Sequence, residues 1–179
     1  MARMKELPPA LLDAVAYAAR AHRSQLRKDD QTPYVSHPFR VCLIVRHLFG
    51  VDDADALAAA VLHDTIEDTD TDYDDLVEKF GPNVASWVAA LSKDKRLPDD
   101  EREAAYMKTL SQSPWQVKVC KLADIYDNLS DSASLNSKGR EKSLARSRKY
   151  LDALRADLPE QAKRPFEIVS DLLKRKQKS

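Results

Sequence analysis

The stretch from Leu57 to Asp68 reads Leu-Ala-Ala-Ala-Val-Leu-His-Asp-Thr-Ile-Glu-Asp. Its first half is apolar and typical of a buried helix, and its second half adds one imidazole and three carboxylates. Burying such groups costs free energy unless a metal ion or close pairing compensates them. Because the dipeptide His63-Asp64 is by itself weak support for a metal site, its meaning depends on ligands elsewhere in the chain.

The composition is that of an ordinary globular protein, with 43% apolar and 32% charged residues among 179. The 29 basic residues balance 29 acidic ones, so no overall charge attracts nucleic acid or a membrane surface. No apolar run approaches the ~20 residues of a membrane span, and residues 1–9 lack a signal-peptide pattern. Cys42 and Cys120 are expected to be buried free thiols. We expect a cytoplasmic protein, and the sequence indicates no particular protein partner.

The residues that start and stop helices divide the chain clearly. Only 3 glycines are present and alternating β-branched runs are absent, which favours helices over sheets. The pattern predicts an all-α fold, a single domain of about eight helices over residues 1–179. Ser36, Asp52 or Asp53, and Asp99 are expected to cap helices. The expected helices are 10–22, 36–48, 53–64, 72–80, 82–91, 99–111, 114–129, 140–156 and 159–174; residues 23–34, an exposed charged segment 92–99 and a mobile segment 130–139 are expected to connect them.

Three other segments supply side chains that can meet the dipeptide. They contain His37, Asp124 and the basic pair Arg27-Lys28. Two imidazoles and two carboxylates form a mixed nitrogen and oxygen set that suits Mn²⁺, Fe²⁺ or Zn²⁺. The candidate metal ligands are therefore His37, His63, Asp64 and Asp124.

Helical spacing places further polar residues one turn from these ligands. Residues four apart share a helix face, so Glu67 and Asp68 lie beneath the two residues of the dipeptide. This spacing predicts a second layer of carboxylates that can hold or deprotonate a water molecule. Asn128 lies one turn after Asp124, and Lys121 lies on its other side, in positions that suit substrate contacts.

Each of these residues also has an ordinary structural interpretation. His37 fits an exposed turn, and Arg27-Lys28 fits a solvated surface pair. Glu67 and Asp68 fit the solvated acidic end of a helix. Asp124 is harder to explain in this way, because its apolar neighbours imply burial. The occurrence of all these residues together, in this order, favours a functional site.

The order His…His-Asp…Asp resembles that of the HD-domain metal-dependent phosphohydrolases. Three longer motifs resemble the hydrolase domain of the RelA/SpoT family: Arg27-Lys-x-x-x-x-Pro-Tyr-x-x-His-Pro38, Leu62-His-Asp-Thr-Ile-Glu-Asp-Thr69 and Lys121-Leu-Ala-Asp-x-x-x-Asn128. The resemblance extends over nearly the whole chain. Since no synthetase or regulatory domain follows in this sequence, we expect a stand-alone small alarmone hydrolase, of the metazoan SpoT homologue group.

The resemblance implies hydrolysis of the 3′-pyrophosphate of (p)ppGpp to GDP or GTP plus pyrophosphate, with Mn²⁺ as cofactor. The ligands that it implies for this ion are His37, His63, Asp64 and Asp124. It implies that Glu67 and Asp68 position and activate the attacking water. The substrate contacts that it implies are Arg27 and Lys28 at the nucleobase, Asn128 at the ribose, and Arg146 and Tyr150 at the phosphates and sugar.

The chain departs from the family pattern at Ser130, which stands where relatives often have an arginine two residues after the motif asparagine. Stacking and charge from Arg27 and Lys28 discriminate guanine from adenine poorly without a specific hydrogen bond. The nucleotides (p)ppApp and NADPH, the latter through its 2′-phosphate, are therefore alternative substrates. A non-catalytic nucleotide sensor is a further alternative, which the intact pair Glu67 and Asp68 disfavours.

Overall fold

The protein is described here by a computed structural model of residues 9–131 and 135–178. Within these ranges, eight α-helices have eight or more residues, α4 is a single turn, and no β-strand occurs beyond an isolated bridge between Leu26 and Pro33. The predicted all-α fold of about eight helices is confirmed. The helices are α1 (Pro9–Ala21), α2 (Ser36–Leu43), α3 (Ala54–Leu62), α4 (Thr65–Asp68), α5 (Tyr73–Leu91), α6 (Asp99–Gln112), α7 (Trp115–Ser130), α8 (Ser137–Arg155) and α9 (Glu160–Lys176), and η1 (Ile44–Leu48) is a π-helical segment.

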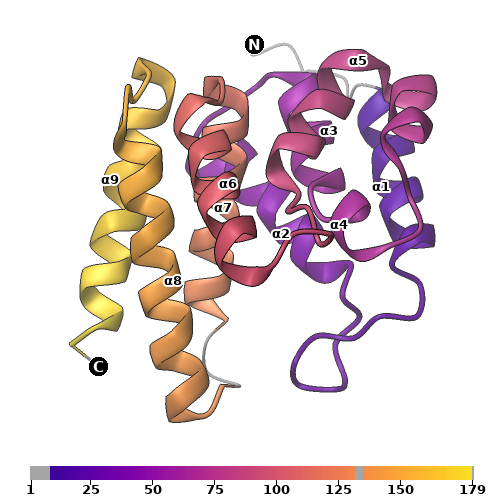
Figure 1. The fold of residues 1–179 in the computed structure, drawn as a ribbon. Coiled ribbons are helices and arrows are strands. Elements are labelled where there is room, and N and C mark those ends of the chain that lie inside the picture. Colours follow the sequence, from indigo (N-terminus) through magenta and orange to yellow (C-terminus); the bar gives the residue numbers. More distant parts are fainter. Residues whose placement is uncertain (1–8, 132–134, 179) are drawn as a thin grey trace, which may run out of the picture.

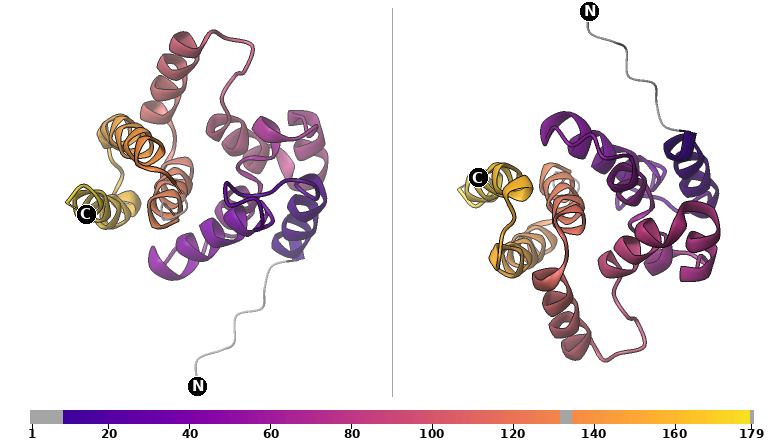
Figure 2. Two further views of the ribbon diagram at one scale, coloured as in Figure 1. Left: turned by 90° about the horizontal axis from the view of Figure 1, so that it is seen from below. Right: turned by 90° about the horizontal axis from the view of Figure 1, so that it is seen from above.

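The helices form two groups with α7 between them (Figure 1). One group consists of α1 to α5, in which α3 packs against α1, α2 and α5. In the other group α8 and α9 lie side by side as a hairpin, and α6 packs against α8 (Figures 1 and 2). Helix α7 contacts α2, α3 and α5 on one side and α8 and α9 on the other. A polar side chain on α7 can therefore face either group.

Helix α3 is buried on every side and carries the dipeptide into the interior. Its residues from Ala56 to Leu62 are all buried, and those from Leu57 onward belong to one continuous hydrophobic cluster. The Asp53 side chain caps its start by accepting a hydrogen bond from the Ala56 N–H at 2.9 Å. Helix α3 ends at Leu62, so His63 lies at the C-terminal end of a buried helix, as predicted.

Two predicted helix caps are wrong by one residue. Ser36 is the first residue of α2, and Val35 precedes it as the capping residue without a side-chain hydrogen bond. The chain enters α2 from a turn in which the Ser36 N–H donates to Pro33, so no side-chain cap is needed there. Asp99 is likewise the first residue of α6, after Pro98.

Other element boundaries differ from the predictions in details of backbone geometry. The expected helix 36–48 changes to π-helical hydrogen bonding after Leu43. The expected helices 72–80 and 82–91 form α5, with a kink at Gly81, whose φ of 83° lies in the left-handed region. Helix α8 begins at Ser137 rather than at residue 140, because Asn136 caps it. Of the expected mobile segment, residues 132–134 lie outside the described residues.

Two further features of the described residues concern the apolar length of the helices and the cysteines, of which only Cys120 is buried as predicted. No helix in the described ranges is both long and apolar enough to cross a membrane. Cys42 and Cys120 are free thiols, the first half-buried and the second fully buried. Burial raises the pKa of the Cys42 thiol to about 11, so it is protonated at neutral pH.

Candidate metal centre

A break in the helix brings the two residues of the dipeptide to one point. His63 follows the last residue of α3, and Asp64 precedes α4. Neighbouring side chains on one continuous helix point about 100° apart. Here the break brings His63 Nε2 to 3.1 Å from Asp64 Oδ2. The Thr65 hydroxyl donates to the Leu62 carbonyl at 2.7 Å and holds the joint between the two helices.

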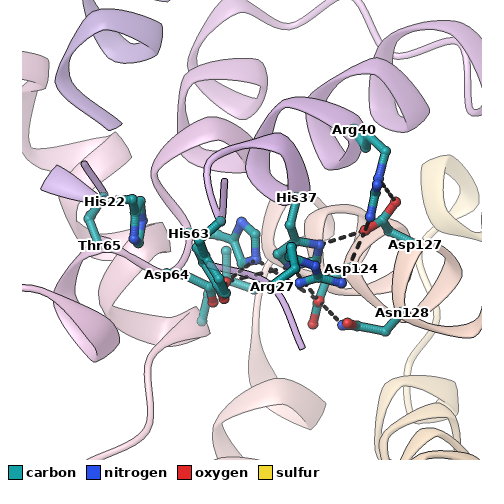
Figure 3. A network of polar contacts seen from close by, with 12 residues as sticks. His22, Arg27, His37, Arg40, His63, Asp64, Thr65, Asp124, Asp127 and Asn128 are labelled. Atoms are coloured by element: carbon teal, nitrogen blue, oxygen red, sulfur yellow. Dashed lines mark hydrogen bonds and ion pairs between the residues drawn. The ribbon is translucent and has the colours of Figure 1, made fainter. Parts of the chain in front are cut away.

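The predicted ligands from α2 and α7 reach the same point (Figure 3). His37 Nε2 lies 3.2 Å from Asp124 Oδ1 and 3.6 Å from Asp64 Oδ2. His63 Nε2 lies 4.0 Å from Asp124 Oδ1. One ligand atom each from His37, His63 and Asp124 lies within 4.8 Å of the other two, and all three residues are buried. Three helices far apart in sequence thus converge on one set of nitrogen and oxygen donors.

The donor set fits a divalent cation. His63 Nδ1 is 2.9 Å from the Ala60 carbonyl, which makes Nδ1 the protonated nitrogen and leaves a lone pair on Nε2. His63 Nε2 is buried and has no hydrogen-bond partner among the described residues. A lone pair facing carboxylates is unfavourable, whereas a cation between them satisfies both. Asp64 Oδ2, the fourth predicted ligand atom, also accepts a hydrogen bond from the Tyr34 hydroxyl at 2.5 Å.

Protonation compensates the same carboxylates when no cation is present. Burial lowers the pKa of His37, but hydrogen bonds to Asp124 and Asp127 outweigh burial and raise the pKa to about 9. The pKa of His63 is also raised, because Asp64 and Asp124 outweigh burial. A proton and a metal ion therefore compete for these imidazoles.

Two residues predicted to contact substrate hold Asp124 in this structure. Burial opposes ionisation of Asp124, but Lys121 and the two imidazoles keep its pKa well below the usual range. Lys121 Nζ donates to Asp124 Oδ2 at 2.8 Å, and Asn128 Nδ2 donates to Oδ1 at 2.5 Å. The Lys121 ammonium is buried 4.6 Å from the centre of the Tyr150 ring. Since both Lys121 and Asn128 also line the cavity described below, their contact with substrate stays a prediction.

The second layer of carboxylates lies on α4 beside Asp64. The Asp68 N–H donates to the Asp64 carbonyl at 2.9 Å, so this pair keeps the predicted one-turn spacing. Asp68 Oδ1 accepts from Lys95 Nζ at 2.8 Å, and Glu67 Oε2 accepts from the Lys93 N–H at 2.9 Å. Burial raises the pKa of Glu67. Two carboxylates in different environments thus stand next to the candidate ligands.

A cavity of about 310 Å³ connects these groups. Its size is at the lower end of the ~300–1,000 Å³ range of small-molecule sites. The pKa of Lys28 is lowered by burial and by the positive charges of Arg146 and Arg27, so cations crowd one side. Every predicted site residue except His63 lines the cavity: Arg27, Lys28, His37, Asp64, Glu67, Asp68, Lys121, Asp124, Asn128, Arg146 and Tyr150.

Sequence reasoning did not assign two residues that touch the ligands. Tyr34 donates to Asp64, and Asp127 Oδ2 lies 2.6 Å from His37 Nδ1. Both residues stand inside the motifs that carry the resemblance. Their position in those motifs was the available signal, but their partners lie 30 and 90 residues away in sequence.

The expectation that segment 92–99 is exposed is wrong for Lys93. Its side chain is only 15% exposed, and Nζ donates to Glu103 Oε1 at 2.6 Å. Nζ also lies 5.4 Å from the ring centre of Tyr106 and 5.3 Å from that of Tyr150. The aromatic rings and the carboxylate compensate its burial, and Lys93 becomes a further cation of the cavity wall.

Comparison with known proteins assigns the family. Residues 14–153 match the HD domain family. The chain belongs to the HD-domain family. Over 122 residues, or 68% of each chain, it is 43% identical to the guanosine-3′,5′-bis(diphosphate) 3′-pyrophosphohydrolase MESH1 of Danio rerio and 44% identical to that of Homo sapiens. A solved structure described as a metazoan orthologue of SpoT that hydrolyses ppGpp matches with a TM-score of 0.85 and 30% identity, over 96% of this chain and 97% of that one.

The chain is also similar to one part of a longer bacterial protein. The bifunctional (p)ppGpp synthase/hydrolase SpoT of Escherichia coli is 35% identical over 138 residues, which is 74% of this HD-domain chain and 19% of SpoT. The predicted membership of the metazoan SpoT homologue group is confirmed, and with it the prediction of a metal-dependent phosphohydrolase.

Proposed function

We propose that this HD-domain hydrolase removes the 3′-pyrophosphate of (p)ppGpp to give GDP or GTP plus pyrophosphate, with Mn²⁺ as its cofactor. The observation that carries the proposal is the convergence of His37, His63 and Asp124 at one end of a cavity, which His37 and Asp124 line and whose other wall is cationic. A polyanionic nucleotide fits this division, because its phosphates can face cations while its scissile bond faces the metal ligands. The names of the zebrafish and human relatives support the same reaction.

The metal would be held by His37 Nε2, His63 Nε2 and the carboxylates of Asp64 and Asp124. When bound, the ion lowers the pKa of water and neutralises charge that develops on the 3′-phosphate. The Lys121 and Asn128 side chains hold the Asp124 carboxylate, and the Tyr34 hydroxyl holds that of Asp64. These contacts fix the donor atoms before the cation arrives.

Glu67 and Asp68 would handle the protons of the reaction. A water oxygen bonds to the phosphorus nearest the ribose, the bond from that phosphorus to the 3′-oxygen breaks, and the 3′-oxygen takes a proton. One carboxylate accepts the proton of the attacking water. Burial raises the pKa of Glu67, which makes it a better proton carrier near neutral pH than an exposed glutamate.

Substrate binding would use the cationic wall. Arg27 and Lys28 would pack against the nucleobase, with the Arg27 guanidinium 5.7 Å from the centre of the Tyr34 ring. Asn128 would contact the ribose. Arg146 on α8, with Tyr150 one turn further along, would contact the phosphates and sugar.

Turnover of the purified protein tests the proposal. We expect Mn²⁺-dependent release of pyrophosphate from ppGpp, detected by anion-exchange chromatography and abolished by EDTA. Parallel assays with ppApp and NADPH decide between the alternative nucleotides. Binding of ppGpp without turnover, with Mn²⁺ and with other divalent ions, would support a sensor and contradict a hydrolase.

A further inference from the structure

Asp127 on α7 anchors the metal-facing histidine of α2 from behind (Figure 3). Its Oδ2 lies 2.6 Å from His37 Nδ1. Arg40 donates to the same carboxylate through Nε to Oδ1 at 2.7 Å and through Nη2 to Oδ2 at 3.0 Å. Asp127 is only 3% exposed. Three donor atoms among the described residues therefore converge on one buried carboxylate.

A second carboxylate, that of Asp131, lies four residues after Asp127 at the C-terminal cap of α7 and holds a different partner. Asp131 Oδ2 accepts from Arg27 Nη2 at 2.9 Å and from Arg27 Nε at 3.3 Å. Arg40 Nη2 also donates to Asp131, at 3.1 Å, and so joins the two carboxylates. Arg27 Nη2 is 4.0 Å from Asp127 Oδ2, so Asp131 is its nearer acceptor.

The contacts of Asp127 affect the orientation of an imidazole, whereas those of Asp131 affect the freedom of an arginine side chain. An acceptor at Nδ1 places the imidazole proton there and turns the Nε2 lone pair of His37 toward Asp124 and Asp64. Arg40 stops the carboxylate from rotating away from His37. The contacts to Arg27 instead restrict a long, flexible side chain of the cavity wall, and such restriction lowers the entropy lost when a ligand binds.

We propose that Asp127 and Asp131 are positioning residues with separate targets: Asp127 orients His37 for the metal, and Asp131 orients Arg27 for the nucleotide. The inference rests on the proposed function in its choice of Mn²⁺ and ppGpp as probes. One helix face thereby adjusts both halves of the site from outside the cavity, since neither Asp127 nor Asp131 lines it.

The test of Asp127 is an Mn²⁺ titration of the full chain without substrate. An amide has one acceptor oxygen, so Asp127→Asn leaves part of the three-donor set unpaired. We expect its Mn²⁺ affinity to fall about 10- to 100-fold by isothermal titration calorimetry. Arg40→Met should weaken Mn²⁺ binding in the same direction by a smaller factor, because it frees the carboxylate without removing it. Wild-type Mn²⁺ affinity in a folded Asp127→Asn variant would overturn the assignment.

Asp131→Asn is the matched variant, since it alters the same network one turn away without touching His37. We expect unchanged Mn²⁺ affinity and a dissociation constant for ppGpp, measured without divalent ions, that rises about three- to tenfold. A loss of Mn²⁺ affinity equal to that of Asp127→Asn would show a shared structural role and overturn the separation. Circular dichroism of each metal-free variant verifies its fold.

The two proposals can fail separately. Wild-type turnover of ppGpp decides the proposed reaction, whereas the Mn²⁺ titrations decide the role of Asp127 whether or not ppGpp is hydrolysed. If wild-type protein turns over ppGpp while Asp127→Asn binds Mn²⁺ normally, the reaction stands and the positioning role is wrong.

Discussion

The two walls of the cavity are built in different ways. At the end of the cavity with the candidate metal ligands, called the metal end below, the imidazoles and carboxylate come from buried positions on α2, after α3 and on α7. His37, His63 and Asp124 each have a second contact that fixes the side chain. On the cationic wall, Lys93 comes from a connecting segment and Arg146 from an exposed position on α8. The metal end is therefore positioned by helix register, and the cationic wall by contacts between segments.

Glu103 on α6 shows how contacts between segments position the cationic wall. Its two carboxylate oxygens accept from Lys93 Nζ at 2.6 Å and from the Tyr150 hydroxyl at 3.0 Å. One side chain thereby links α6, α8 and the segment before α6. The difference between the walls teaches that changes at the metal end should act on metal binding and chemistry, whereas changes on the cationic wall should act on substrate affinity.

Replacement of a buried ligand should have the largest effect. We expect Asp124→Ala to abolish Mn²⁺ binding and to lower turnover by at least about 10³-fold, because an oxygen donor is lost and Lys121 is left buried without its partner. Calorimetry and steady-state assays measure the two effects. Asp124→Asn is the control for the buried lysine, since it keeps an acceptor for Lys121. Wild-type Mn²⁺ affinity in either variant would show that Asp124 is not a ligand of the metal ion.

The carboxylates of α4 should separate chemistry from metal binding. We expect Asp68→Asn to bind Mn²⁺ normally and to lower kcat by about 10²- to 10⁴-fold, the usual contribution of a general base. Glu67→Gln, assayed alongside, shows which of the two carboxylates carries the proton. Turnover equal to wild type in both variants would contradict the role proposed for this layer.

A rise in pH should strengthen Mn²⁺ binding and lower the stability of the metal-free protein. The folded-state pKa of His37 is raised from 6.5 to about 9, so protonated His37 must lose its proton to bind Mn²⁺. As the pH rises from 6.5 to about 9, we expect Mn²⁺ affinity to rise by up to about tenfold per pH unit. The stabilisation that His37 gives the metal-free protein is complete below about pH 6.5 and is lost as the pH rises through about 9. Calorimetry and urea unfolding at several pH values test both trends; a pH-independent affinity would contradict the first.

A substitution on the cationic wall should change substrate affinity alone. We expect Arg146→Ala to raise KM about tenfold with little change in kcat or in Mn²⁺ affinity, because it removes a charge that acts equally on substrate and transition state. Arg148→Ala is the matched control, since Arg148 is exposed on the same helix and does not line the cavity. Equal effects of the two variants would indicate a general electrostatic attraction rather than a specific contact.

The smallest effect should come from the distant end of α3. Asp53→Ala removes the N-terminal cap of this helix and should cost about 1 kcal/mol of unfolding free energy. We expect unchanged Mn²⁺ affinity, because the buried residues from Ala56 to Leu62 hold the other end in place. Urea unfolding and calorimetry measure both quantities. A loss of Mn²⁺ affinity would show that helix fraying reaches His63.

The helices that carry the candidate metal ligands could be predicted from sequence because their signals are local. An apolar run followed by His63-Asp64 identifies α3 and its end, and helical spacing places Asn128 one turn from Asp124. The contact between His37 and Asp127 could not be predicted in this way, since it joins residues 90 positions apart. Helical spacing cannot rank such pairs, because it relates residues only within one helix.

The cationic wall was harder to predict for the same physical reason. Lys93 lies in a charged segment whose composition is typical of an exposed loop. Its burial depends on the Tyr106 and Tyr150 rings and on Glu103, which come from two later helices. Only the packing of α6 against α8 brings these partners together.

The joint between α3 and α4 restricts how the length of this chain can change. A residue inserted between His63 and Thr65 would displace α4 and rotate it relative to α3. Glu67 and Asp68 would then leave the cavity together, even though no side chain had been replaced. Libraries of single-residue insertions and deletions should therefore show a sharp minimum of tolerance at these two peptide bonds, set by rotational phase rather than by the chemistry of the inserted residue.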